Sequence, residues 1–157
     1  MDQSFGTMRL PATPDAVAPD GSDVRVLLQL GRGGMAHFEL APGRVSRAVA
    51  HHHVEEIWYI VGGYGQMWRR QGAREETVPL EPGTCLSIPA GTHFQFRAAA
   101  AGPLAAAAGP LAAAAGPLAA AAGPLAAVGV TMPPWPGDDE AYEVTGAWPA
   151  EPPGPPA

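Results

Sequence analysis

Between residues 23 and 97 the chain alternates short apolar runs with breaks rich in glycine, proline and charged residues, such as GRGG, GGYG and EPG. The apolar runs have the length of single β-strands and cover residues 23–30, 35–41, 56–61, 65–70, 75–80, 84–89 and 93–97. Short, closely spaced strands with glycine turns and no amphipathic helix are typical of antiparallel sandwiches and barrels. The pattern therefore predicts an all-β domain.

Residues 98–125 depart from this pattern, because AAAAGPL is repeated there four times without a change. The proline in every copy excludes a continuous helix, since proline removes a helical hydrogen bond and clashes with the preceding turn. Residues 126–132 again have the composition of a strand. We expect 126–132 to form a hairpin with 93–97, with the Ala-Gly-Pro-Leu repeat as an insert in its loop, since loop-closure entropy rises only slowly with length.

The two ends of the chain have a different composition from the strand region. Residues 1–22 are polar and proline-spaced, and the C-terminal stretch is dense in proline. We therefore expect an N-terminal arm at 1–22, one barrel at 23–132 with the repeat insert at 98–125, and a Pro-rich tail at 133–157.

Composition narrows the classes of partner and the location. The formal net charge is −6 and all nine basic residues are arginine, without a basic stripe, which excludes nucleic-acid binding as the expected role. Cys85 is the only cysteine, so no internal disulfide forms and a reducing compartment is favoured. No apolar run reaches the roughly 20 residues that span a bilayer, and the N-terminus does not have the pattern of a secretion signal. We expect a cytoplasmic protein without a membrane partner, and the Lys-free composition indicates a GC-rich bacterial genome.

Two segments carry the candidate chemistry. In AHHHVEEIWYIVGGYG (50–65), three adjacent histidines precede Glu55 and Glu56, which open an apolar strand that ends in glycines. In PGTCLSIPAGTHFQF (82–96), a Pro-Ala-Gly turn joins two strands, and His93 begins the second. Six residues separate Glu56 from Gly63 in the first segment.

These two segments resemble the two sequence motifs of the cupin superfamily. The first motif runs Gly, five residues, His-x-His, three or four residues, Glu, six residues, Gly; the second runs Gly, five residues, Pro-x-Gly, two residues, His. Glu56 and Gly63 match the first, and Gly83, Pro89 and Gly91 match the second. The resemblance covers about 23–132 apart from the repeat. It implies a small single-domain cupin of the type-2 conserved-barrel kind, with a double-stranded β-helix, or jelly-roll, fold.

In metal-binding cupins the two motifs bring two histidines, one glutamate and a third histidine together. The resemblance thus makes His51, His52, His53, Glu56 and His93 the candidate ligands of one divalent metal (Fe, Mn, Ni or Zn). Two registers stay open: His52 with three residues before Glu56, or His51 and His53 with only two. His93 lies one residue before the family's position, which Phe94 occupies here. A metal-free pocket therefore stays open as an alternative.

Strand alternation places Trp58 and Ile60 on the same face as Glu56, and we expect them, with Phe94, Gln95 and Phe96, to contact a ligand. The predicted function is a small-molecule-binding cupin of unassigned activity, and the alternative is a metal-dependent oxygenase, isomerase or decarboxylase with His/His/Glu ligands. The opposite face of the same strand carries Ile57, Tyr59 and Val61, which predicts an apolar surface for a homodimer.

Overall fold

The computed structural model describes residues 3–100 and 123–150 of the chain. The repeat copies within 101–122 lie outside the described residues, so the predicted insert remains a prediction. None of the helices in the described part is long and apolar enough to cross a membrane.

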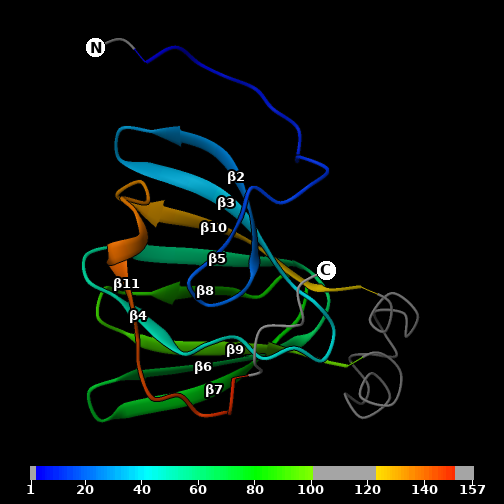
Figure 1. Ribbon diagram of the computed structural model, residues 1–157, viewed down its shortest axis with the longest axis vertical. Coiled ribbons are helices and arrows are strands. Elements are labelled where there is room, and N and C mark those ends of the chain that lie inside the picture. Colours follow the sequence, from blue (N-terminus) through cyan, green and yellow to red (C-terminus); the bar gives the residue numbers. More distant parts are fainter. Residues whose placement is uncertain (1–2, 101–122, 151–157) are drawn as a thin grey trace.

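The described residues form two antiparallel sheets that face each other across one core (Figure 1). The six-stranded sheet has the order β1-β2-β3-β10-β5-β8, and the five-stranded sheet has the order β11-β4-β9-β6-β7. The strands are β1 (Ala16–Val17), β2 (Asp23–Leu30), β3 (Gly33–Leu40), β4 (Val49–His51), β5 (Glu55–Gly62), β6 (Gly65–Gln71), β7 (Arg74–Leu80), β8 (Cys85–Ile88), β9 (His93–Ala98), β10 (Leu125–Met132) and β11 (Ala141–Glu143), with a short 3₁₀ helix η1 (Asp138–Glu140) before β11. The all-β jelly-roll architecture expected from the sequence is confirmed.

The expected hairpin between 93–97 and 126–132 is wrong. Strand β9 lies in the five-stranded sheet beside β4 and β6, whereas β10 lies in the six-stranded sheet between β3 and β5. The chain between β9 and β10 therefore connects the two sheets. The physical reason is that β10 carries apolar side chains along most of its length, so it suits a central position, and β3 and β5 provide one.

Three short strands were not among the predicted elements. Strand β4 places Val49–His51 beside β9, β1 pairs with β2, and β11 pairs with β4. Each has only two or three residues, too few to show an alternating pattern in the sequence. Through β1 and β11, residues from both ends of the chain are joined to the sheets.

Strand β5 shows how the sequence pattern positions side chains. Its residues alternate between exposed and buried, so that Glu56, Trp58 and Ile60 point into the space between the sheets. The strand ends at a turn in which Gly63 has φ 72°, a conformation that disfavours residues with a Cβ atom. A Cβ atom at Gly63 would also collide with the backbone of Pro124 and Leu125. The last glycine of the first motif is thus required by the close approach of the chain entering β10.

Candidate functional site

A cavity of about 220 Å³ opens between the two sheets, at the end of the core where β2, β3 and β5 of the six-stranded sheet face β4 of the five-stranded sheet. Its wall is mainly apolar and carries a few polar groups. The lining includes Val17, Asp20, Val24, Val26, Ala36, Phe38, His51, Glu56, Trp58, Thr131, Trp135 and Asp138. Val17, Val26 and Asp138 are exposed, so they lie toward the mouth, whereas His51, Glu56 and Trp58 are buried at the inner end.

Stacked aromatic rings form one wall of the cavity. The rings of Phe38 on β3 and Trp58 on β5 lie 5.1 Å apart with an interplanar angle of 14°. Strand β10 runs between β3 and β5, and Gly129 leaves the space that these rings occupy. A Cβ atom there would lie 2.7 Å from the Phe38 ring and 3.1 Å from the Trp58 ring. Phe96 contacts Trp58 edge-on at 5.1 Å, so Trp58 is fixed from two sides.

The inner end of the cavity holds a carboxyl group and an imidazole. Glu56 and His51 are each only 4% exposed. The indole N–H of Trp58 donates a hydrogen bond to Glu56 Oε2. His51 Nδ1 lies 3.7 Å from Glu56 Oε1, which is beyond hydrogen-bond distance, and this buried nitrogen has no hydrogen-bond partner among the described residues. The His51 ring is instead flanked by Phe94 and Trp135, with ring centroids 5.3 and 5.0 Å away.

Burial changes the charge state of both groups. It raises the pKa of Glu56 to about 7; the hydrogen bond from Trp58 opposes this rise, and the charge of Asp20 adds to it. Burial also lowers the pKa of His51 to about 4, against the opposing effect of the Glu140 charge. Near neutral pH His51 is therefore neutral, and its contact with Glu56 is not an ion pair.

A second buried carboxyl group lies near Glu56. Asp20, in the turn between β1 and β2, is 6% exposed and lines the same cavity. Its Oδ1 accepts hydrogen bonds from the backbone N–H of Ser22 at 2.8 Å and from the Ser22 hydroxyl at 2.6 Å. Burial raises the pKa of Asp20 despite these bonds. Two carboxyl groups thus share a poorly hydrated region.

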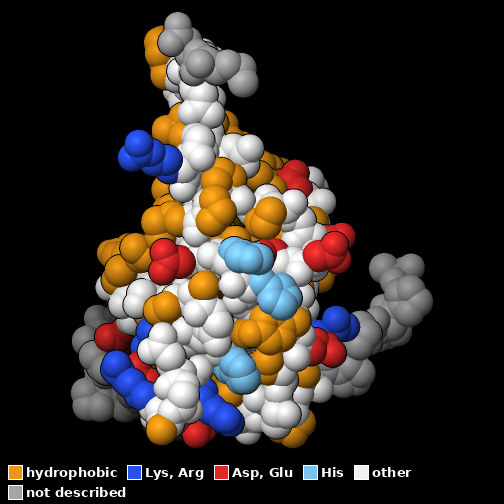
Figure 2. All heavy atoms as spheres, turned by 90° about the vertical axis from the view of Figure 1, so that its left-hand side faces the viewer, with side chains coloured by type: hydrophobic (Ala, Val, Ile, Leu, Met, Phe, Trp, Pro, Cys, Tyr) orange, Lys and Arg blue, Asp and Glu red, His pale blue; other side chains and the backbone are white. Residues whose placement is uncertain are grey.

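The other predicted histidines are not brought to Glu56. Strand β4 ends at His51, and His52 and His53 lie in the turn before β5 with exposed side chains. Figure 2 shows histidine side chains exposed on one face of the molecule. The His53 side chain is 82% exposed, and its Nδ1 lies 3.2 Å from Glu140 Oε2. The ring of His52 packs 4.5 Å from that of Tyr142.

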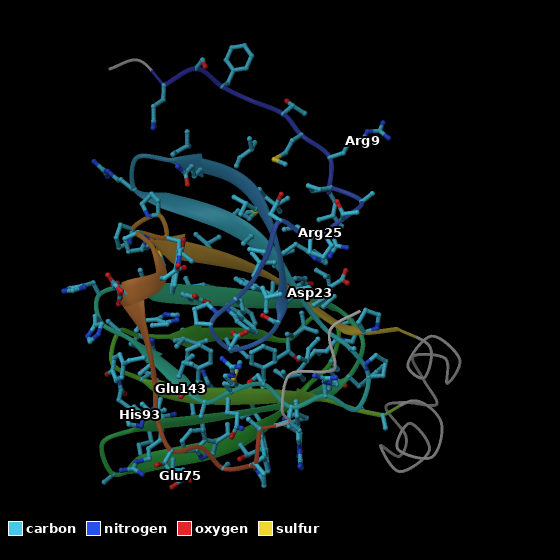
Figure 3. All side chains as sticks on the ribbon, viewed as in Figure 1. Arg9, Asp23, Arg25, Glu75, His93 and Glu143 are labelled. Atoms are coloured by element: carbon cyan, nitrogen blue, oxygen red, sulfur yellow. The ribbon has the colours of Figure 1, made fainter. Side chains whose placement is uncertain are left out.

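His93 also lies away from the cavity. It begins β9 and is half-buried, and the inward positions of that strand belong to Phe94 and Phe96. Figure 3 shows His93 on the lower, five-stranded sheet. The structure thus brings together only His51 and Glu56 from the five candidate metal ligands.

This donor set does not fit a catalytic divalent metal. Such sites use about three protein ligands and leave further positions open for water or substrate. Within residues 3–100 and 123–150 no three histidine, cysteine, aspartate or glutamate side chains are grouped to hold a metal ion. We therefore assign no chemistry to a metal at this site.

Of the five residues predicted to contact a ligand, Trp58 lines the cavity. Ile60, Phe94 and Phe96 are buried in the core behind the wall. Gln95 points to the other side of β9. There its Nε2 donates to Ser46 O at 2.9 Å and Trp148 O at 2.7 Å, and its Oε1 accepts from Trp148 N at 2.9 Å. Gln95 therefore anchors the C-terminal segment at Trp148 to β9.

The lining residues that were not singled out from the sequence include Asp20, Trp135 and Asp138. Asp20 lies in the predicted arm, and the other two lie in the predicted tail. Local signals exist, because Asp20-Gly-Ser22 has the composition of a turn and a tryptophan within PPWPG is unusual for a solvated tail. Neither signal indicates that both segments reach the same cavity.

The central part of the chain matches a known protein family. Residues 36–108 match the family model described as a cupin domain. This part of the chain is a cupin domain. Comparison with the sequences of curated proteins gives no significant match.

Solved structures with the same fold cover most of the chain. Streptomyces PAC13 with uridine has a TM-score of 0.58 and 13% identity, covering 89% of this chain and 92% of that one. A protein with a double-stranded β-helix domain from Klebsiella pneumoniae has a TM-score of 0.58 and 12% identity, covering 91% and 100%. KdgF from Halomonas sp. has a TM-score of 0.54 and 15% identity, covering 76% and 84%. At these identities the likeness establishes the cupin fold alone.

Proposed function

We propose that this cupin binds a compact organic molecule in the cavity between its sheets, with Trp58 and Phe38 against the body of the ligand and the His51–Glu56 end against its polar group. The observation that carries the proposal is the buried His51 Nδ1, which has no hydrogen-bond partner among the described residues and belongs to a side chain that lines the cavity. Buried polar groups are normally satisfied, and a ligand atom or a water at this position would supply the missing bond.

The size of the cavity limits the ligand. Pockets for drug-sized molecules are about 300–1,000 Å³, whereas this cavity has about 220 Å³. It suits a molecule of about one ring. A structural neighbour, Pac13, is described as a nucleoside dehydratase, and PAC13 has been solved with uridine, so a protein of this fold takes a small ligand.

The metal-dependent alternative receives less support, because only two of its five proposed ligands converge. The enzymatic alternative that the geometry favours is metal-independent acid–base chemistry. A carboxyl group with a pKa of about 7 exchanges protons readily near neutral pH, and Glu56 has this property within a cavity.

The proposal extends to assembly and location. On the outer face of β5, Ile57, Tyr59 and Val61 are each about half exposed, which supports a homodimer through this face. The single cysteine supports a reducing compartment such as the cytoplasm.

A thermal-shift screen of one-ring compounds tests the proposal, with Val26→Phe as an occluded variant. Val26 is 50% exposed and lines the cavity, so a larger side chain there fills space without a forced clash in the core. Leu30→Phe is the matched control, because Leu30 is 60% exposed on the same strand, β2, and does not line the cavity. We expect compounds that stabilise the wild type and Leu30→Phe but not Val26→Phe. If every stabilising compound acts equally on all three proteins, the cavity is not the binding site.

A further inference from the structure

The charged groups that line the cavity are acidic. Asp20 and Glu56 are buried in its wall, and Asp138 lies exposed toward its mouth. None of the described residues that line the cavity is arginine, and the chain contains no lysine. His51 is the only other titratable group among the described lining residues, and it is neutral near pH 7 because burial lowers its pKa to about 4.

Arg25 is the arginine closest in sequence to the lining residues of β2, but it does not line the cavity. Arg25 lies between Val24 and Val26, so its side chain leaves the opposite face of the strand. Its Nε donates to Pro11 O at 2.8 Å, and its Nη1 lies 3.4 Å from Glu39 Oε1. Figure 3 shows it on the six-stranded sheet. An anionic ligand would therefore meet carboxyl groups without a compensating cation.

The carboxyl group of Glu56 has only one hydrogen-bond partner among the described residues. Glu56 Oε2 accepts the Trp58 N–H, whereas Oε1 lies 3.7 Å from His51 Nδ1 without forming a hydrogen bond. A buried carboxylate is costly unless it is paired with a cation or well hydrogen-bonded. A cationic donor between Oε1 and Nδ1 would satisfy both atoms. The aromatic faces of Phe38 and Trp58 would stabilise the same charge through cation–π contact.

Building on the proposed function, we propose that the ligand of this cavity is a compact organic cation, an ammonium group on an apolar body of about one ring. The ammonium group donates to Glu56 Oε1 and to His51 Nδ1, and the body lies against the Phe38–Trp58 wall. Asp138 lies exposed toward the mouth, where its carboxylate favours the approach of a cation, and the aromatic ring of Trp135 lines the same cavity beside His51.

Three probes of nearly equal shape separate the charge of the ligand from its size: 2-phenylethylamine, 2-phenylethanol and phenylacetate. Binding is measured by isothermal titration calorimetry with the full-length protein at pH 8, where the amine is cationic and most of Glu56 is ionised. We expect the amine to bind at least tenfold more tightly than the alcohol, and phenylacetate to bind more weakly than either. In Glu56→Gln the amine should lose at least tenfold in affinity while the alcohol is unchanged. The matched control is Glu55→Gln, which removes an exposed carboxylate from the other face of β5 and should change nothing.

The other possible outcomes refute either the charge of the ligand, its partner in the cavity, or the pocket itself. If the alcohol binds as tightly as the amine, or phenylacetate binds most tightly, the ligand is not a cation, and the pocket proposal stands provided that Val26→Phe abolishes that binding. If the amine binds equally to wild type and Glu56→Gln, the assigned charge partner is wrong. If none of the three probes binds at millimolar concentration, both the cation proposal and the one-ring pocket are refuted.

Discussion

Replacing Glu56 with glutamine should change how the stability of the fold depends on pH. Glutamine has nearly the shape of glutamic acid, and its Oε1 can accept the Trp58 N–H that Glu56 Oε2 accepts. The substitution removes the ionisable group and leaves the packing at the inner end of the cavity in place. It therefore isolates the cost of burying the carboxylate.

The magnitude follows from the pKa. In the folded protein the pKa of Glu56 rises from its ordinary value of 4.5 to about 7. At 1.36 kcal/mol per pKa unit, this rise corresponds to about 3 kcal/mol. Because the folded state holds the proton more tightly than the unfolded state, the contribution to stability is fully present below pH 4.5 and is lost as the pH rises through about 7. Glu56→Gln should thus match the wild type near pH 4.5 and exceed it by about 3 kcal/mol at pH 8.

Urea denaturation followed by far-ultraviolet circular dichroism at several pH values between 4.5 and 8.5 measures this difference. Buried Asp20, whose pKa is also raised, and His51, whose pKa is lowered, contribute their own pH dependence to both proteins. The difference between wild type and variant at each pH is therefore the relevant quantity. The control Glu55→Gln should show no such trend. A difference between wild type and Glu56→Gln that is constant across the range would refute the reasoning.

Three further changes test other parts of the structure. Gly129→Ala should destabilise the fold by about 1–3 kcal/mol, because the added Cβ atom displaces the Phe38 and Trp58 rings. The control in the same melting experiment is Gly123→Ala, because a Cβ atom at Gly123 meets nothing within 4 Å. Equal melting temperatures for the two variants would contradict the steric argument. Deleting residues 98–118 leaves one AAAAGPL copy and should change the melting temperature little. The ends of β9 and β10 are already close, because Arg97 O and the Leu125 side chain both approach Gly65. A large drop in melting temperature would show that the repeat is structural. Light scattering should give a dimer mass for the wild type and a monomer mass for Val61→Arg, and a wild-type monomer at micromolar concentration would contradict the proposed interface.

The sequence predicts the strands and the first motif well because both depend on local features. The inward position of Glu56 and Trp58 follows from alternation along one strand, and Gly63 follows from a turn with positive φ. These properties need no knowledge of distant contacts. The fold class could therefore be predicted from residues 23–97 alone.

The positions of the histidines could not be predicted from strand alternation alone. Alternation placed His51 and His53 on one face, but β4 ends at His51 and the chain turns, so His53 is exposed and pairs with Glu140. Likewise, the pairing of β10 with β3 and β5 depends on which sheet receives it, which adjacent sequence does not specify. Asp20 and Trp135 reach the cavity from segments far apart in the chain for the same reason.

The central claim is that ligands enter a cavity whose polar end is His51 and Glu56. The most direct test is nitrogen NMR of the five histidine rings during titration with 2-phenylethylamine and, separately, 2-phenylethanol. His51 lines the cavity, while His52, His53 and His93 do not, and His37 lies on β3 beside Glu39 outside it. We expect the ring nitrogens of His51 to shift in a saturable manner while those of the other four histidines stay unchanged. Saturable shifts at His52, His53 or His93 with His51 unmoved would contradict the central claim.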